Sequence, residues 1–138
     1  MSIVQTQTTS FKKELYQAVH NLSTDTLKIA LYTGNANLNA DTTVYASTNE
    51  VAATGYTAGG NTLTGVSISS SGSTAYVNWA NTSWTAALTA RCALIYNVTQ
   101  GNKSIAVIDF GADKTSTTTF TITMPSNTST TALIRSSN

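Results

Sequence analysis

Charged side chains are the first thing this sequence lacks. Only 9% of its 138 residues are Asp, Glu, Lys or Arg, against about 25% in an ordinary soluble domain. The formal net charge is +1, and the longest run of like charge is the pair Lys12 and Lys13. A nucleic-acid-binding surface needs clustered Lys and Arg to neutralise phosphates. The sequence therefore predicts no nucleic-acid partner.

Long apolar runs are also missing. No stretch is long enough to cross a bilayer as a helix, and the N-terminus lacks the basic start and apolar centre of a signal peptide. We therefore expect no membrane partner and synthesis in a cytoplasm. The single cysteine, Cys92, cannot form an internal disulfide. Because it lies in an apolar run, we expect a small buried hydrophobic side chain rather than a nucleophile.

Groups suited to catalysis are few and scattered. Glycan hydrolysis usually needs a pair of carboxylates, and His20, the only histidine, has no second metal ligand or triad partner near it in sequence. The segment 34–41 is rich in Asn but lacks the Gly and Glu of a calcium loop at the required offsets, so we expect a turn there. No enzymatic activity, cofactor or metal site is predicted. The acidic residues, mostly at expected turns or element ends, are Glu14, Asp25, Asp41, Glu50, Asp109 and Asp113.

Threonine, serine and asparagine take the place of the missing charges, with 27, 16 and 12 copies. Thr is β-branched and suits strands, whereas Asn and Ser suit turns. The composition predicts an all-β protein with a neutral surface rich in hydroxyl and amide groups. Such a surface suits proteins that pack side by side, because each charge removed from water in a contact is costly. It is equally consistent with an ordinary neutral β domain.

The densest apolar stretch, Arg91 to Phe110, predicts the centre of the fold. Two β-prone runs, 93–96 and 105–108, flank a polar loop at 97–103 that contains a glycine. This arrangement is typical of an antiparallel hairpin. Neither run alternates cleanly between apolar and polar residues. We therefore expect both faces of the hairpin to be covered, as in the centre of a sandwich or at a subunit contact.

The rest of the chain predicts further short strands and one helix. Ser10 is a plausible N-cap for a helix over 11–20, which is expected to plug one edge or end of the sheet layers. The sequence thus predicts one β-sandwich or jelly-roll-like domain over 10–138, with about eight short antiparallel strands and one short N-terminal helix. Strand order stays open. The other expected strands lie at 26–33, 44–46, 62–69, 74–80, 115–124 and 131–135, with turns at 69–73 and 111–114.

Two groups of residues are candidates for contacts with other proteins. Residues 1–9 form an extended polar segment whose only apolar anchors are Ile3 and Val4. We expect an arm that is free or that docks on a neighbouring subunit. The second group is aromatic and consists of Tyr45, Tyr56, Trp79 and Trp84. The tryptophans are interpreted as core or interface anchors, with stacking on sugars as the alternative.

Several segments together resemble a family of small tailed-bacteriophage virion proteins. They are TLKIALYT, TNEVAATGYTAGG, the stretch from Trp79 to Trp84, RCALIYN, AVIDFGADK, and TFTITMP followed by ALIR. Their order and spacing over about residues 10–135, rather than any single motif, carry the resemblance. It implies a non-enzymatic capsid decoration (cement) protein that is made in the host cytoplasm and sits on the outer surface of the head. The implied partners are the major capsid protein and further copies of the chain, expected as a homotrimer on local threefold axes.

A second hypothesis keeps the virion but moves the protein to the tail, the neck or a fibre, as an adaptor or host-binding module. The aromatic group would then supply the contact residues. Copy number discriminates the two hypotheses, because a decoration protein is present in hundreds of copies and a tail component in about six to a few tens.

Overall fold

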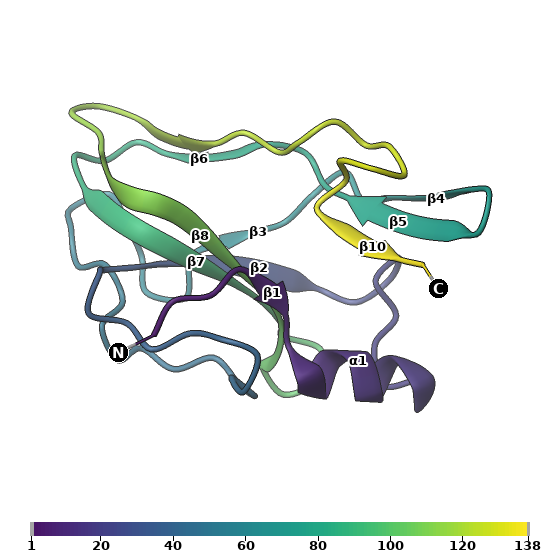
Figure 1. Cartoon of the computed structure of the whole chain (residues 1–138). Helices are drawn as coiled ribbons and strands as arrows, with labels where there is room; N and C mark the ends of the chain where they lie inside the picture. The colour runs from purple at the N-terminus through teal and green to yellow at the C-terminus, as the bar shows by residue number, and fades with distance from the viewer. Residues whose placement is uncertain (1, 138) are drawn as a thin grey trace.

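The computed structural model describes residues 2–137 and shows an all-β architecture with one short helix, which confirms the predicted fold class (Figure 1). The helix is α1 (Thr9–Tyr16). The strands are β1 (Thr6–Gln7), β2 (Leu27–Tyr32), β3 (Asn61–Thr62), β4 (Ser67–Ser71), β5 (Thr74–Asn78), β6 (Thr82–Trp84), β7 (Thr89–Asn97), β8 (Lys103–Thr115), β9 (Phe120–Ile122) and β10 (Ile134–Ser136).

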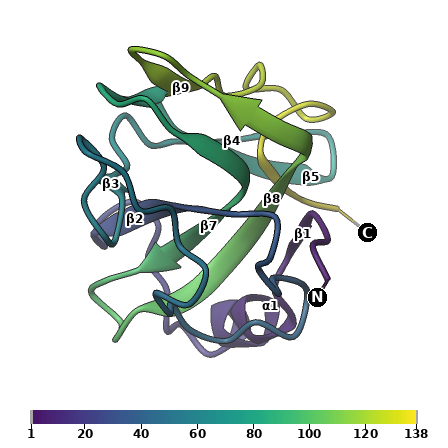
Figure 2. The same ribbon diagram turned by 90° about the vertical axis from the view of Figure 1, so that its left-hand side faces the viewer.

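The strands form three antiparallel sheets. A five-stranded sheet has the order β1-β8-β7-β2-β3, a three-stranded sheet the order β10-β5-β4, and β6 pairs with β9. The two smaller sheets lie over one face of the five-stranded sheet, as Figures 1 and 2 show. The main core lies between these layers and contains Ile29 and Ile95 from the large sheet together with Val77, Trp84 and Phe120 from the small ones.

The predicted central hairpin is the pair β7–β8, and both of its faces are covered. Ala93 and Ile95 point into the main core, whereas Cys92 and Leu94 point into a second cluster on the opposite face. That second cluster is closed by the loop after β2, through side chains such as Leu38. Two buried faces explain why this sequence shows an apolar run rather than an alternation.

The turn expected at 111–114 is a bulge within one long strand. In the β7–β8 pairing, Ala90 faces Lys114 and Cys92 faces Asp109, so residues 110–113 stand opposite Arg91 alone. Gly111 has φ +82° there, a conformation that glycine adopts readily. The turn-forming residues are therefore used to bend β8 instead of ending it.

Residues 2–8 of the N-terminal segment lie against their own chain instead of forming the arm expected at residues 1–9, of which Met1 is outside the described residues. Thr6 pairs with Val107 and Gln7 with Ala106, so that β1 becomes an edge strand of the large sheet. Thr8 is fully buried and caps α1, with its hydroxyl oxygen accepting from the N–H of Phe11 at 3.3 Å. The expected cap at Ser10 was wrong by two positions. A strand of two residues has no periodicity, so the sequence pattern did not indicate it.

Helix α1 is shorter than expected because the chain turns at Ala18, which has φ +57°. It lies at one end of the sheets (Figure 1).

Three expected strands also differ in length from the strands in the structure. The strand expected at 62–69 is split into β3 and β4 around Gly65, the strand expected at 115–124 forms β9 only over Phe120–Ile122, and the segment 44–46 makes a single bridge from Val44 to Lys103.

Candidate functional site

The structure separates the six candidate contact residues. Trp79, Trp84 and Tyr56 are buried in the main core, with 5%, 4% and 8% of their surface exposed. Of the interpretations left open for the tryptophans, the structure therefore shows core anchors, and these three side chains do not form a contact surface on this chain.

The other three candidates lie nearer the surface. Ile3 and Tyr45 are half-buried against the second cluster, and Val4 is 48% exposed. The backbone of the N-terminal segment is held by a bridge between Ile3 and Leu38 and by a 3.0 Å hydrogen bond from the N–H of Val4 to the carbonyl of Leu38. Ile3 therefore acts as an anchor on its own chain.

A carboxylate organises the loop between β2 and β3. Glu50 accepts hydrogen bonds from the hydroxyl groups of Tyr45 at 2.6 Å and Tyr56 at 2.5 Å, and from the N–H of Gly59 at 2.7 Å. Tyr96 stacks on Tyr45, with ring centroids 4.6 Å apart. The hydroxyl of Tyr96 donates to the carbonyl of Gly59 at 2.6 Å. These contacts join the loop to β7 and give Glu50 a structural role.

Ionisation of this tyrosine cluster is strongly opposed. Burial, followed by the nearby Glu50 carboxylate, raises the pKa of Tyr96 to about 12. Burial also raises the pKa of Tyr32 and Tyr56 well above the ordinary value, and that of Tyr45 likewise. Each hydroxyl therefore stays protonated and donates its hydrogen bond throughout the neutral range.

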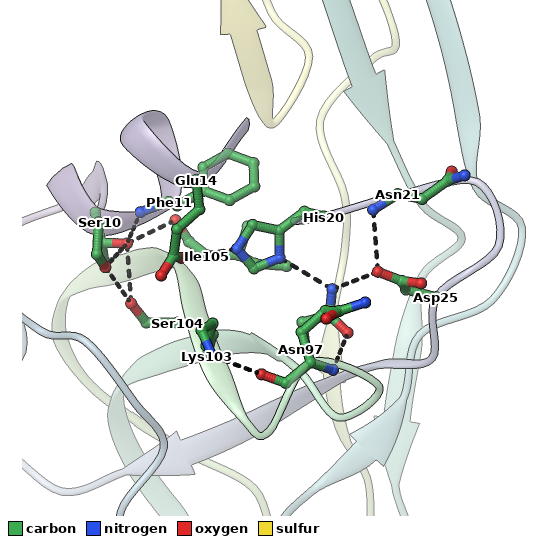
Figure 3. Close-up of polar contacts among 12 residues, drawn as sticks. Ser10, Phe11, Glu14, His20, Asn21, Asp25, Asn97, Lys103, Ser104 and Ile105 are labelled. Atoms are coloured by element: carbon green, nitrogen blue, oxygen red, sulfur yellow. Dashed lines mark hydrogen bonds and ion pairs between the residues drawn. The ribbon is translucent and has the colours of Figure 1, made fainter. Parts of the chain in front are cut away.

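His20 belongs to a second polar network, at the junction of α1 with the β7–β8 loop (Figure 3). Its Nε2 lies 2.9 Å from Oε1 of Glu14, and its Nδ1 lies 3.0 Å from Nδ2 of Asn97. Because Asn97 Nδ2 can only donate, Nδ1 accepts and Nε2 carries the proton that bonds Glu14. Nδ2 of Asn97 also donates to Oδ2 of Asp25 at 2.8 Å. His20 is thus held on both sides and has no free nitrogen for a ligand.

Two further titratable groups in the described residues have environments that fit a structural role. Burial acts to raise the pKa of Asp25, but hydrogen bonds from the N–H of Asn21 and from the side chain of Asn97 outweigh it and lower that pKa. Burial raises the pKa of the Cys92 thiol to about 12, in keeping with the predicted buried position. Among residues 2–137, no three His, Cys, Asp or Glu side chains come together as metal ligands.

One layer of the sandwich is almost free of charge. The sequence has no charged residue between Glu50 and Arg91, and none between Lys114 and Arg135. The structure brings these two distant stretches together, because β10 pairs with β5 and β6 pairs with β9. Arg135 is the single charged residue in the strands of the two small sheets. On β6–β9, the cross-strand pair Ser83 and Thr121 is exposed on the outer face.

The four strands without any charged residue, β4, β5, β6 and β9, form what we call the charge-free layer, and this layer also carries an open sheet edge. All residues of β4 are exposed. Beside it lies a groove of about 430 Å³ between α1 and the three-stranded sheet. Leu15, Val77 and Ile134 are among the side chains that line this groove. The layer therefore combines hydroxyl groups, apolar side chains and an open edge, a combination suited to contact with another protein.

Comparisons with protein-family models, with curated protein sequences and with solved structures gave no match to this chain. Within residues 2–137, the structure contains no helix with the length and apolar character needed to span a membrane.

The sequence analysis found the low overall charge but not the uncharged layer, and it missed both polar networks. The low overall charge was visible, but the pairing that places both uncharged stretches in one layer was not. Asn97 gave no signal, because its partners His20 and Asp25 lie in a segment with no local pattern that links it to Asn97. The coincidence of several Tyr residues with a lone Glu in a Gly-rich loop is the only hint that the sequence contained of the first network.

Proposed function

We propose that this chain is a non-enzymatic structural protein of a tailed-phage virion, most specifically a capsid decoration protein. It binds the outer surface of the head lattice through the major capsid protein and stabilises the shell. The observation that carries the proposal is the charge-free layer. A surface of hydroxyl groups and apolar side chains can be buried against a partner without removing charges from water.

Repetition gives such a protein its effect. Each contact of a small domain with the lattice is modest, but a domain that bridges neighbouring shell subunits engages several sites at once. The resemblance to small phage virion proteins supports this role, and a homotrimer on local threefold axes is the oligomer that fits it. Apart from Arg135 on β10, the charged residues lie on α1, β2, β7 and β8 and on the loops before and after β2, outside the charge-free layer.

The experiment that tests the proposal is immunogold labelling of intact purified particles with an antibody against this chain, followed by electron microscopy. Gold spread over the head, with hundreds of copies per particle by quantitative mass spectrometry, is the expected result. Gold confined to the tail or neck, with about six to a few tens of copies, would reject the decoration role in favour of a tail, neck or fibre component. Particles without any label would reject both virion roles.

A further inference from the structure

The open edge of the three-stranded sheet is a defined row of backbone groups. β4 pairs on one side with β5, and no other strand among the described residues lies on its other side. The hairpin β4–β5 has a two-residue loop, Gly72 and Ser73, so Ser71 and Thr74 form its last hydrogen-bonded pair. Because bonding direction alternates along a strand, Ser67, Ser69 and Ser71 face β5. The N–H and C=O groups of Ile68 and Ser70 therefore point outward.

The sequence and pairing of this strand lack the devices that normally block strand addition. The segment between β9 and β10 reaches it at its first residue, where Nδ2 of Asn127 donates to Oγ of Ser67 at 2.9 Å, and all five residues of β4 remain exposed. β4 reads SISSS, without Lys, Glu, Pro or Gly, and its pairing with β5 is continuous without a bulge. Natural edge strands usually carry an inward charge, a proline, a bulge or a covering loop. In Figure 1 the β4–β5 hairpin projects from the body, with β4 on its outer side.

The row of apolar side chains across this sheet ends in an exposed side chain on the edge strand. Ile134, Val77 and Ile68 are direct cross-strand neighbours. Ile134 and Val77 are each 5% exposed, but Ile68 at the edge is 56% exposed. A further strand beside β4 would cover Ile68 and extend the row, and this face is the one that borders the groove beneath α1.

We propose that β4 pairs with β4 of a second copy of this chain, antiparallel about a twofold axis through Ser69. In this register Ile68 of each copy stands opposite Ser70 of the other, so all the outward N–H and C=O groups of both strands are bonded. The three-stranded sheets of the two copies become one continuous sheet of six strands. The two isoleucines lie diagonally across the axis, within reach of each other.

The absence of charge around this edge favours a second copy of the chain as its partner. The surfaces that would meet are both uncharged from Val51 to Ala90, so two identical faces approach without like-charge repulsion. A contact about a twofold axis closes at two copies. It is therefore distinct from the ring contact of a trimer, and the inference does not rest on a role in the virion. A five-residue edge buries less than the roughly 800 Å² per partner of a standard interface, so the free pair is weak.

Disulfide trapping tests both the pairing and its register. Directly opposed residues that do not exchange backbone hydrogen bonds have Cα atoms about 4.5 Å apart, within the range that a disulfide spans. In S69C the new cysteines meet at the axis, and we expect a covalent dimer to form at least tenfold faster than in S71C. In S71C the two cysteines are displaced along the strands by four residues, about 13 Å. The native chain serves as a control, because Cys92 is buried.

A mixture of two cysteine variants tests the register of the pairing directly. Ser67 of one copy faces Ser71 of the other, so a mixture of S67C and S71C chains should yield mainly the mixed dimer, although each alone cross-links slowly. Adding I68K to S69C should slow trapping about tenfold while the melting temperature stays near that of S69C, because Ile68 is an exposed side chain. Equal trapping rates for S69C and S71C, or no effect of I68K in a folded protein, would overturn the proposal.

Discussion

The hydroxyl of Tyr56 stands between the backbone of β2 and the carboxylate of Glu50. It accepts from the N–H of Leu31 at 2.9 Å and donates to Oε2 of Glu50 at 2.5 Å. A buried aromatic side chain thereby connects the central sheet to the only acidic residue of the loop from Thr43 to Gly60. Among residues 2–137, Glu50 forms no ion pair within 4 Å, and its carboxylate is held by hydrogen bonds.

We expect Glu50→Ala to lower the free energy of unfolding by about 3 kcal/mol, because it leaves the donors of Tyr45, Tyr56 and Gly59 without their acceptor. Urea denaturation followed by tryptophan fluorescence measures the change. The matched control is Asp41→Ala, which removes an exposed acidic side chain and should change stability by less than about 0.5 kcal/mol. Equal effects of the two substitutions would contradict the role assigned to Glu50.

The tyrosine cluster predicts a loss of stability in alkali. In the folded state the pKa values of Tyr32, Tyr45, Tyr56 and Tyr96 are raised above the ordinary value of 10.0, mainly by burial. Above pH 10 the unfolded chain loses these protons first, so the free energy of unfolding falls as pH rises. The tyrosinate absorbance of these four side chains should therefore appear together with the loss of near-ultraviolet circular dichroism. Full tyrosinate absorbance in a protein that keeps its near-ultraviolet circular dichroism would refute this prediction.

Asn97→Asp should destabilise the protein strongly at neutral pH. The side chain of Asn97 is fully buried and its Nδ2 donates to both His20 and Asp25. A carboxylate in its place would face Asp25 across the 2.8 Å that now separates Nδ2 of Asn97 from Oδ2 of Asp25, at a cost of roughly 3 kcal/mol. Lowering the pH adds protons to this pair of carboxylates and should narrow the difference from the native chain. The control is Asn35→Asp at an exposed position, and thermal unfolding across pH makes the comparison.

Gly60→Ala should be among the most damaging small substitutions in the chain. Gly60 has φ +80°, and a Cβ atom there would lie 1.8 Å from the carbonyl oxygen of Ile29. Because that obstacle is backbone in β2, we expect a loss of about 3 kcal/mol or more. Gly72→Ala is the control, since its φ is +59° with nothing within 4 Å. It should cost only about 1 kcal/mol, and chemical denaturation distinguishes the two.

The proposed decoration role predicts that a charge placed on the charge-free layer weakens attachment to the capsid. Thr121 is exposed on the outer face of β9, so Thr121→Glu leaves the core intact but adds a carboxylate that binding would remove from water. We expect at least tenfold weaker binding to particles that lack this protein, about 1.4 kcal/mol, measured by co-sedimentation. Thr43→Glu, at an exposed site on the opposite loop, is the control. Unchanged binding by a folded Thr121→Glu chain would count against this surface.

The sequence by itself determined the elements whose signal is local. β2, β5 and the hairpin β7–β8 lie close to where the apolar pattern predicted them, because alternation or a continuous apolar run reports directly on which faces of a strand are covered. The all-β class followed from the abundance of threonine and the shortage of helix-forming runs. The buried state of Cys92 followed from its place in the central run.

The tertiary structure decided whatever depends on partners far away in the chain. The pairing of Thr6 with Val107 turned an expected arm into a strand, and the opposition of Arg91 to residues 110–113 turned an expected turn into a bulge. The burial of Trp79 and Trp84, and the hydrogen bonds that Glu50 and Asn97 make, were set in the same way. Such contacts join segments whose local sequence does not indicate which distant segment they pair with. Only the packing of the layers selects one pairing among many.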